Sequence, residues 1–97
     1  MPKIYISGPI SGLNPSEVSK SFAEAEKWLK RQGFIPVSPL NNGLPESATY
    51  TEHMLRDLQM LSECDEVYML EGWENSRGCR IEIAEAASLK KTIKFQQ

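Results

Sequence analysis

The feature that most constrains the fold is a regular alternation of strand-like and helix-like segments along the whole chain. Residues 3–7, 34–38, 67–70 and 92–95 have the composition of short strands, and the segments between them repeat apolar residues at helical spacing. Strands separated by helices predict a parallel sheet with right-handed crossovers and helices on both faces. We therefore expect an α/β fold, a three-layer flavodoxin-like or Rossmann-like sandwich around a small, mostly parallel sheet of four to five strands.

The predicted helices have recognisable starts. Asn14-Pro15-Ser16-Glu17 places an N-cap residue before a proline at the first helical position, and Thr49 to Glu52 has the capping-box spacing. An apolar stripe follows the first of these starts, formed by Val18, Phe22, Ala25 and Leu29. Pro36 forfeits a ladder hydrogen bond, so the second strand is expected at an edge of the sheet.

Length and composition predict one compact domain over residues 1–97. The chain is 40% hydrophobic and 25% charged, which is typical of a folded domain. A domain of this size buries only about 60–65% of the surface of its unfolded chain, so burial against a second subunit would add stability. We expect a homodimer or a higher homo-oligomer.

Charge and hydropathy exclude several classes of partner. A net charge of −2 gives no overall attraction to the phosphates of a nucleic-acid polymer. No run of about 18 apolar residues is present, so no membrane partner is expected. Two cysteines, Cys64 and Cys79, and a single histidine, His53, make neither a disulfide framework nor a structural zinc site. These features predict a reduced, cytoplasmic protein without a bound metal.

Two carboxylates are candidates for chemistry, because this topology directs both toward the edge of the sheet where ligands bind. Asp57 lies on the flank of one predicted helix, and Glu82 follows Ser76 and Gly78 in what we expect to be the first turn of another. There, free backbone N–H groups would stabilise an ionised nucleophile. A pair of carboxyl groups can cleave a glycosidic bond, one attacking the anomeric carbon and the other protonating the leaving group. The alternative is two solvated helix charges, with Ser76 and Gly78 as a plain cap and turn.

Other polar residues have two interpretations each. Cys79 is either a thiolate near a helix N-terminus or a small buried hydrophobic residue. His53 either bonds Asp57 one helical turn away or is an isolated exposed histidine. Asn41 and Asn42 either read the edge of a base or form the turn before Gly43 in the long loop at 39–48.

Three stretches together resemble the nucleoside 2-deoxyribosyltransferase-like superfamily, over nearly the whole chain. They are Tyr5-Ile6-Ser7-Gly8-Pro9, then Asp57, then the segment from Gly72 to Glu82 followed by Ala84. Within this superfamily the chain is closest to a compact branch classed as a domain of unknown function, found in bacteria and their phages. The spacing from Asp57 to Glu82, combined with Ser-x-Gly-x-x-x-Glu, is the most specific part of the resemblance.

The resemblance implies roles for individual residues. Glu82 would be the nucleophile that forms a glycosyl-enzyme intermediate at C1 of the deoxyribose, Asp57 would assist departure of the base, and Tyr5 would orient the nucleophile. Trp73 would be a stacking wall for a base or a dimer contact. The remaining positions would line the sugar or a 5′-phosphate, and these are Ser7, Gly8, Pro9, Ile10, Ser11, Gly12, Ser76 and Gly78.

The predicted function is therefore cleavage or transfer of the N-glycosidic bond of a nucleoside, a deoxynucleoside or a nucleoside 5′-monophosphate. The partner is a small molecule, and the implied mechanism needs no metal or organic cofactor. Two rival hypotheses belong to other classes. One is a catalytically silent nucleotide-binding module, and the other is a purely structural homo-oligomer.

Overall fold

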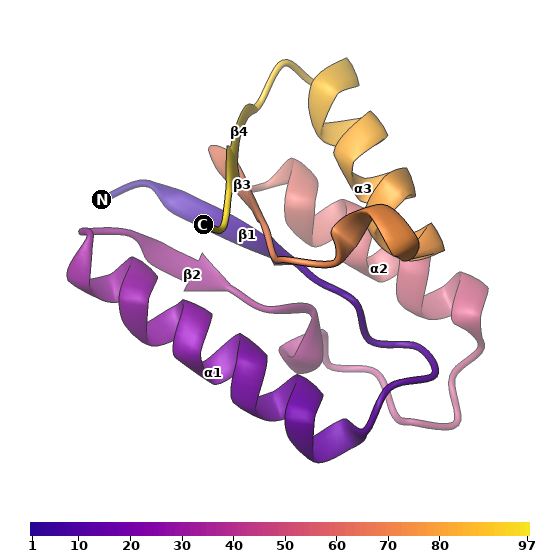
Figure 1. Cartoon of the computed structure of the whole chain (residues 1–97). Helices are drawn as coiled ribbons and strands as arrows, with labels where there is room; N and C mark the ends of the chain where they lie inside the picture. Colours follow the sequence, from indigo (N-terminus) through magenta and orange to yellow (C-terminus); the bar gives the residue numbers. More distant parts are fainter.

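The computed structural model describes all residues 1–97 as a parallel sheet of four strands covered by three α-helices (Figure 1). The strands lie in the order β2-β1-β3-β4, with every neighbouring pair parallel. This confirms the predicted α/β sandwich. Along the chain the elements are β1 (Lys3–Ser7), α1 (Pro15–Arg31), β2 (Ile35–Val37), the 3-10 helix η1 (Pro39–Asn41), α2 (Tyr50–Ser62), β3 (Glu66–Met69), the 3-10 helix η2 (Trp73–Asn75), α3 (Arg77–Ser88) and β4 (Thr92–Phe95).

The boundary signals in the sequence have the expected physical basis. The side chain of Asn14 accepts hydrogen bonds from the backbone N–H groups at the start of α1, and Thr49 and Glu52 form a complete capping box at α2. Pro36 lies in β2, which is an edge strand. A proline is tolerated there because an edge strand has one unpaired side.

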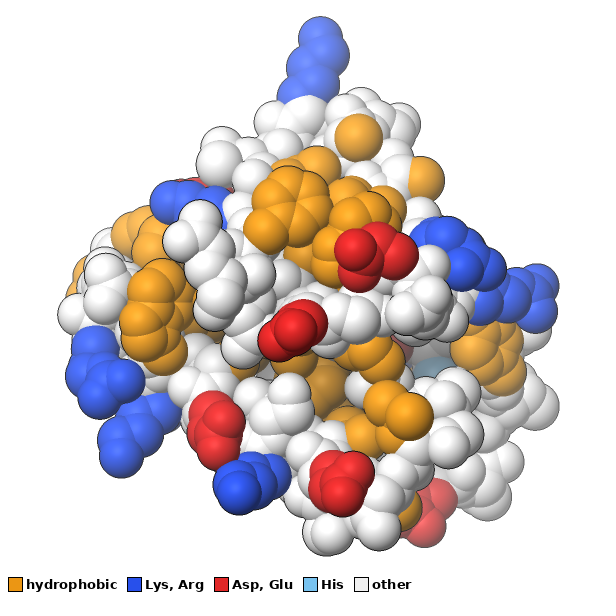
Figure 2. Space-filling view, viewed as in Figure 1, with side chains coloured by type: hydrophobic (Ala, Val, Ile, Leu, Met, Phe, Trp, Pro, Cys, Tyr) orange, Lys and Arg blue, Asp and Glu red, His pale blue; other side chains and the backbone are white.

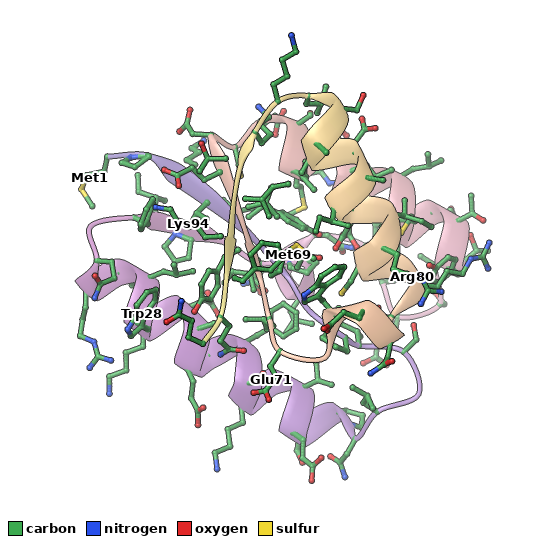
Figure 3. All side chains as sticks on the ribbon, turned by 45° about the horizontal axis from the view of Figure 1, so that its top comes forward. Met1, Trp28, Met69, Glu71, Arg80 and Lys94 are labelled. Carbon is green, nitrogen blue, oxygen red and sulfur yellow. The ribbon has the colours of Figure 1, made fainter.

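Two hydrophobic cores lie on opposite faces of the sheet, as a three-layer sandwich requires. On one face, Ile4 and Ile6 of β1 pack against the stripe of α1 that contains Phe22 and Leu29. On the other face, a second core that includes Tyr5 and residues of α2, β3 and α3 fills the space below these helices. Figure 3 shows Met69, a member of this second core, inside the molecule, while Arg80 on α3 points outward. Successive residues of β1 therefore serve different layers.

The topology creates a switch point at the carboxyl end of β1. The chain leaves β1 toward β2 on one side and returns as β3 on the other, so the loops after β1 and β3 diverge from neighbouring strand ends (Figure 1). Such a switch point is where open α/β sheets bind ligands. Gly8 begins the first of these loops, and a Cβ built on it would lie 2.5 Å from Leu70 Cδ1, so only glycine lets the chain leave β1 here. None of the helices is both long and apolar enough to span a bilayer.

Candidate active site

Glu82 lies in the interior, and it is not in the first turn of its helix as the sequence suggested. α3 begins at Arg77, with Ser76 as its N-cap, so Glu82 is the sixth residue and its carboxylate lies beyond the reach of the free N–H groups. Its side chain is 5% exposed. Stabilisation of its charged form must therefore come from other donors.

Two hydroxyl groups from β1 supply those donors. The Ser7 hydroxyl donates to Glu82 Oε1 and the Tyr5 hydroxyl donates to Glu82 Oε2, each at 2.6 Å. Distances this short are typical of O–H···O⁻ bonds to an ionised acceptor. Tyr5 and Ser7 stand two residues apart on one strand, so both point toward α3. Together they fix the orientation of both carboxylate oxygens.

Burial dominates the electrostatics of this group. It raises the pKa of Glu82 to about 7, while the bonds from Ser7 and Tyr5 oppose the rise and the negative charge of Asp57 adds to it. Burial, with the charges of Glu82 and Asp57, also raises the pKa of Tyr5 far above its ordinary value. The phenol therefore stays protonated and remains a donor throughout the physiological range.

Asp57 lies on α2 and is also buried, with 8% of its surface exposed. The interpretation of Asp57 and Glu82 as solvated helix charges is therefore wrong. Burial raises the pKa of Asp57, and a hydrogen bond from Asn42 Nδ2 to Asp57 Oδ1 at 3.0 Å opposes that rise. Because the charge of Asp57 acts on both Glu82 and Tyr5, the two carboxyl groups belong to one buried cluster.

The turn before α3 has a structural role that the sequence left open. Ser76 Oγ accepts a hydrogen bond from the Cys79 N–H at 3.2 Å, which makes Ser76 a capping residue. A Cβ on Gly78 would lie 3.5 Å from the Tyr50 hydroxyl, an ordinary contact distance. Burial raises the pKa of Cys79, so this residue is a small buried hydrophobic group and not a thiolate.

The predicted substrate-binding residues fall into two groups. The loop after β1 lies at the same edge of the sheet, with Pro9 half-buried and the segment 10–12 exposed, but it makes no hydrogen bond to either carboxyl group. The ring of Trp73 lies 5.8 Å from the ring of Phe95 on β4 and packs against the second core. The structure thus brings Tyr5 and Ser7 to Glu82, whereas the contacts of Trp73 are with apolar side chains.

Asn42 is the member of the cluster whose importance the sequence did not reveal. It is 5% exposed, and its Nδ2 lies 2.9 Å from His53 Nδ1 as well as 3.0 Å from Asp57. His53 thus meets Asp57 through Asn42 and not directly. The one feature of the sequence that pointed to Asn42 was its place in the loop at 39–48, because a loop this long in so small a domain is often functional.

A broad hollow of the surface lies away from these carboxylates, between α1 and β4. It is lined by Trp28, Tyr68, Ile93 and Phe95, among others. No group of three or more His, Cys, Asp or Glu side chains could hold a metal ion. Figure 2 shows acidic and basic side chains interspersed on the face in view, without a continuous basic patch. Assembly into a homo-oligomer stays a prediction.

Three solved structures share this fold. The 2-deoxyribosyltransferase of Bacillus psychrosaccharolyticus is 23% identical with a TM-score of 0.74, over 96% of this chain and 70% of that chain. The CMP N-glycosidase BcmB of Clostridium botulinum is 17% identical with a TM-score of 0.67, over 96% and 69%. The 2-deoxyribosyltransferase of Leishmania mexicana is 20% identical with a TM-score of 0.75, over 98% and 63%.

The chain thus spans 63% to 70% of the length of these three proteins, whose identities to it establish a common fold. No curated protein sequence matches. A family model matches residues 2–95. The resemblance inferred from the sequence is confirmed: the chain has the 2-deoxyribosyltransferase-like fold and belongs to the family described as Domain of unknown function (DUF4406).

Proposed function

We propose that the protein cleaves or transfers the N-glycosidic bond of a nucleoside, a deoxynucleoside or a nucleoside 5′-monophosphate, with Glu82 as nucleophile and Asp57 as general acid. The observation that carries this proposal is the pair of buried carboxyl groups, one of which has a hydroxyl donor on each oxygen. The fold shared with 2-deoxyribosyltransferases and a CMP N-glycosidase supports the same class of substrate.

The hydrogen bonds favour this division of roles. Two buried carboxyl groups whose charges interact share their protons, so the pair titrates jointly. Glu82 accepts two hydroxyl donors, which favours its ionised form, whereas Asp57 accepts one amide donor on Oδ1 and keeps Oδ2 for a proton. The reactive form therefore carries its proton on Asp57 and its negative charge on Glu82, and because burial raises the pKa of Glu82 to about 7, this form competes with one in which Glu82 holds the proton.

The reaction follows from these assignments. A lone pair of the Glu82 carboxylate attacks C1 of the sugar, the bond from C1 to the base nitrogen breaks, and its electron pair leaves with the base while Asp57 transfers its proton to that base. Water then attacks C1, loses a proton to the Asp57 carboxylate and releases Glu82. A second base in place of water gives transfer. Tyr5 and Ser7 hold the nucleophile in place through both steps.

Incubation with a panel of deoxynucleosides and their 5′-monophosphates tests the proposal, with free base measured by chromatography. Wild type should release base from at least one compound, whereas Glu82→Gln should release none, because the amide cannot attack C1. Glu85→Gln removes a carboxylate from the same helix without contacting Tyr5 or Ser7, and it should behave as wild type. Thermal stabilisation by a compound without release of free base would instead indicate a binding module. If no compound is cleaved and none stabilises the protein, the hypothesis of a structural protein is favoured.

A further inference from the structure

Asn42 is a buried side chain in which every polar atom has a partner. Its Oδ1 accepts a hydrogen bond from the Leu44 N–H at 3.0 Å, and its backbone carbonyl accepts one from Arg56 Nε at 3.0 Å. Its Nδ2 lies 3.0 Å from Asp57 Oδ1 and 2.9 Å from His53 Nδ1. The hydrogen bond from the Leu44 N–H to Oδ1 forms an Asx turn that shapes the loop. The two contacts of Nδ2 join the amide to α2.

The orientation of this amide is fixed by its neighbours. Exchanging Oδ1 and Nδ2 would place an NH₂ group against the Leu44 N–H and an oxygen against the Asp57 carboxyl group, so both contacts would become repulsive. Nδ2 therefore donates one proton to Asp57 and the other to His53 Nδ1. A ring nitrogen that accepts a hydrogen bond carries no proton, so this geometry fits the His53 tautomer with its proton on Nε2.

We propose that Asn42 is a positioning residue that occupies Asp57 Oδ1, leaves the transferable proton on Oδ2, and couples this arrangement to the Nε2–H tautomer of His53. The inference rests on the proposed role of Asp57 as general acid. It differs from a loop-closing role, because the Asx turn to Leu44 needs only the acceptor oxygen of Asn42, whereas both contacts to α2 need its NH₂ group.

The coupling makes the acid sensitive to charge on two sides. Glu82 from α3 and Tyr5 from β1 interact with Asp57 on one side, and His53 reaches it through Asn42 on the other. We call the two contacts of the Asn42 NH₂ group with Asp57 and His53 the clamp. A proton on His53 Nδ1 would face this NH₂ group with a second donor, so the Nδ1–H tautomer of His53 breaks the clamp. Loss of the Asn42 donor removes a hydrogen bond that lowers the pKa of Asp57, so this pKa should then rise.

Asn42→Ser separates the two roles, since a serine hydroxyl can still accept from the N–H two residues on but offers no second donor. Asn41→Ala is the matched control, because Asn41 is the exposed neighbour in η1. His53 is the only histidine, so the nitrogen-15 spectrum of its imidazole is unambiguous. Wild type and Asn41→Ala should show the Nε2–H form alone, and Asn42→Ser should show a mixture of tautomers. An Nδ1–H form in wild type, or an unchanged spectrum in Asn42→Ser, overturns the clamp.

The carboxyl carbon-13 signal of Asp57, assigned by its loss in Asp57→Asn, gives the second readout. Its midpoint should move to higher pH in Asn42→Ser and stay in place in Asn41→Ala. The basic limb of the pH profile of kcat/KM for base release should move in the same direction in Asn42→Ser. If wild type releases base and this limb is unchanged in Asn42→Ser, the positioning role is refuted. Absence of base release from wild type refutes the proposed function, while the two spectra still decide whether the clamp exists.

Discussion

Replacement of Glu82 by glutamine should stabilise the protein at alkaline pH, because it removes a charge that the fold buries. The pKa of Glu82 is about 7 in the folded chain, above the ordinary 4.5. Between these two pH values the folded chain binds more protons at Glu82 than the unfolded chain does. The contribution of this group to the free energy of unfolding is therefore greatest below about pH 4.5 and is lost as the pH rises through about 7.

The size of the effect follows from the shift. Since 7 − 4.5 is 2.5 units, and one unit corresponds to 1.36 kcal/mol, ionised Glu82 costs the fold about 3 kcal/mol at pH 8. At pH 5 the Glu82 carboxyl group is substantially ionised only in the unfolded chain, and its burial then lowers the free energy of unfolding by about 1 kcal/mol. Glutamine is neutral at every pH. The stability of Glu82→Gln relative to wild type should therefore increase by about 2 kcal/mol between pH 5 and pH 8, equivalent to roughly 10 °C in Tm for a domain of this size.

Urea unfolding followed by the fluorescence of Trp28 and Trp73 measures this difference at a series of pH values. Any constant change in hydrogen bonding to Tyr5 and Ser7 shifts the whole curve, and the pH dependence isolates the buried charge. Glu85→Gln controls for the loss of one negative charge from α3. A difference between Glu82→Gln and wild type that stays flat from pH 5 to pH 8 would refute the argument that burial dominates this carboxyl group.

Three further predictions concern Tyr5 and two glycines near the site. Tyr5→Phe removes a donor to the nucleophile, so the acid limb of base release should move up by about one pH unit, whereas Tyr68→Phe, which faces α1 across the sheet, should leave it in place. Gly8→Ala should lower the free energy of unfolding by about 1–3 kcal/mol, because its Cβ has no room, and equal urea midpoints would contradict this. Gly78→Ala finds only ordinary contacts and should keep or slightly raise stability, and a loss of base release in that variant alone would place substrate beside Gly78.

The sequence predicted the fold well because its local signals agree with one another. The stripe of Val18, Phe22, Ala25 and Leu29 is the buried face of α1, and the caps at Asn14 and Thr49 begin the helices where expected. These features depend on residues close together in the chain. The edge position of Pro36 was predicted, whereas the complete order β2-β1-β3-β4 was not, because it depends on contacts between strands far apart in the chain.

The candidate site was predicted in part, and the errors have a common cause. The contact of Tyr5 with Glu82 spans 77 positions, and its presence was inferred from the resemblance and not from the spacing of residues. Glu82 was expected one turn too early in its helix, because the turn at 72–76 forms a separate 3-10 segment before α3 begins. The turn at Asn42 was one of the two interpretations offered, but its contact with Asp57 was not predicted, because it depends on the packing of the 39–48 loop against α2, which no local pattern encodes.

The two hydroxyl groups that bind Glu82 belong to β1, which lies between β2 and β3 in the sheet. The opposite face of β1 carries Ile4 and Ile6, which are part of the core packed against α1. Tyr5 and Ser7 can therefore separate from Glu82 only when the whole domain unfolds. We expect the amide hydrogens of β1 to exchange with solvent at the rate set by global unfolding. The exposed parts of the surrounding loops, at 10–13 and 45–47, lack this constraint. Variation in those loops can change what is bound while the geometry of the nucleophile is inherited unchanged, which separates the evolution of substrate choice from that of the reaction.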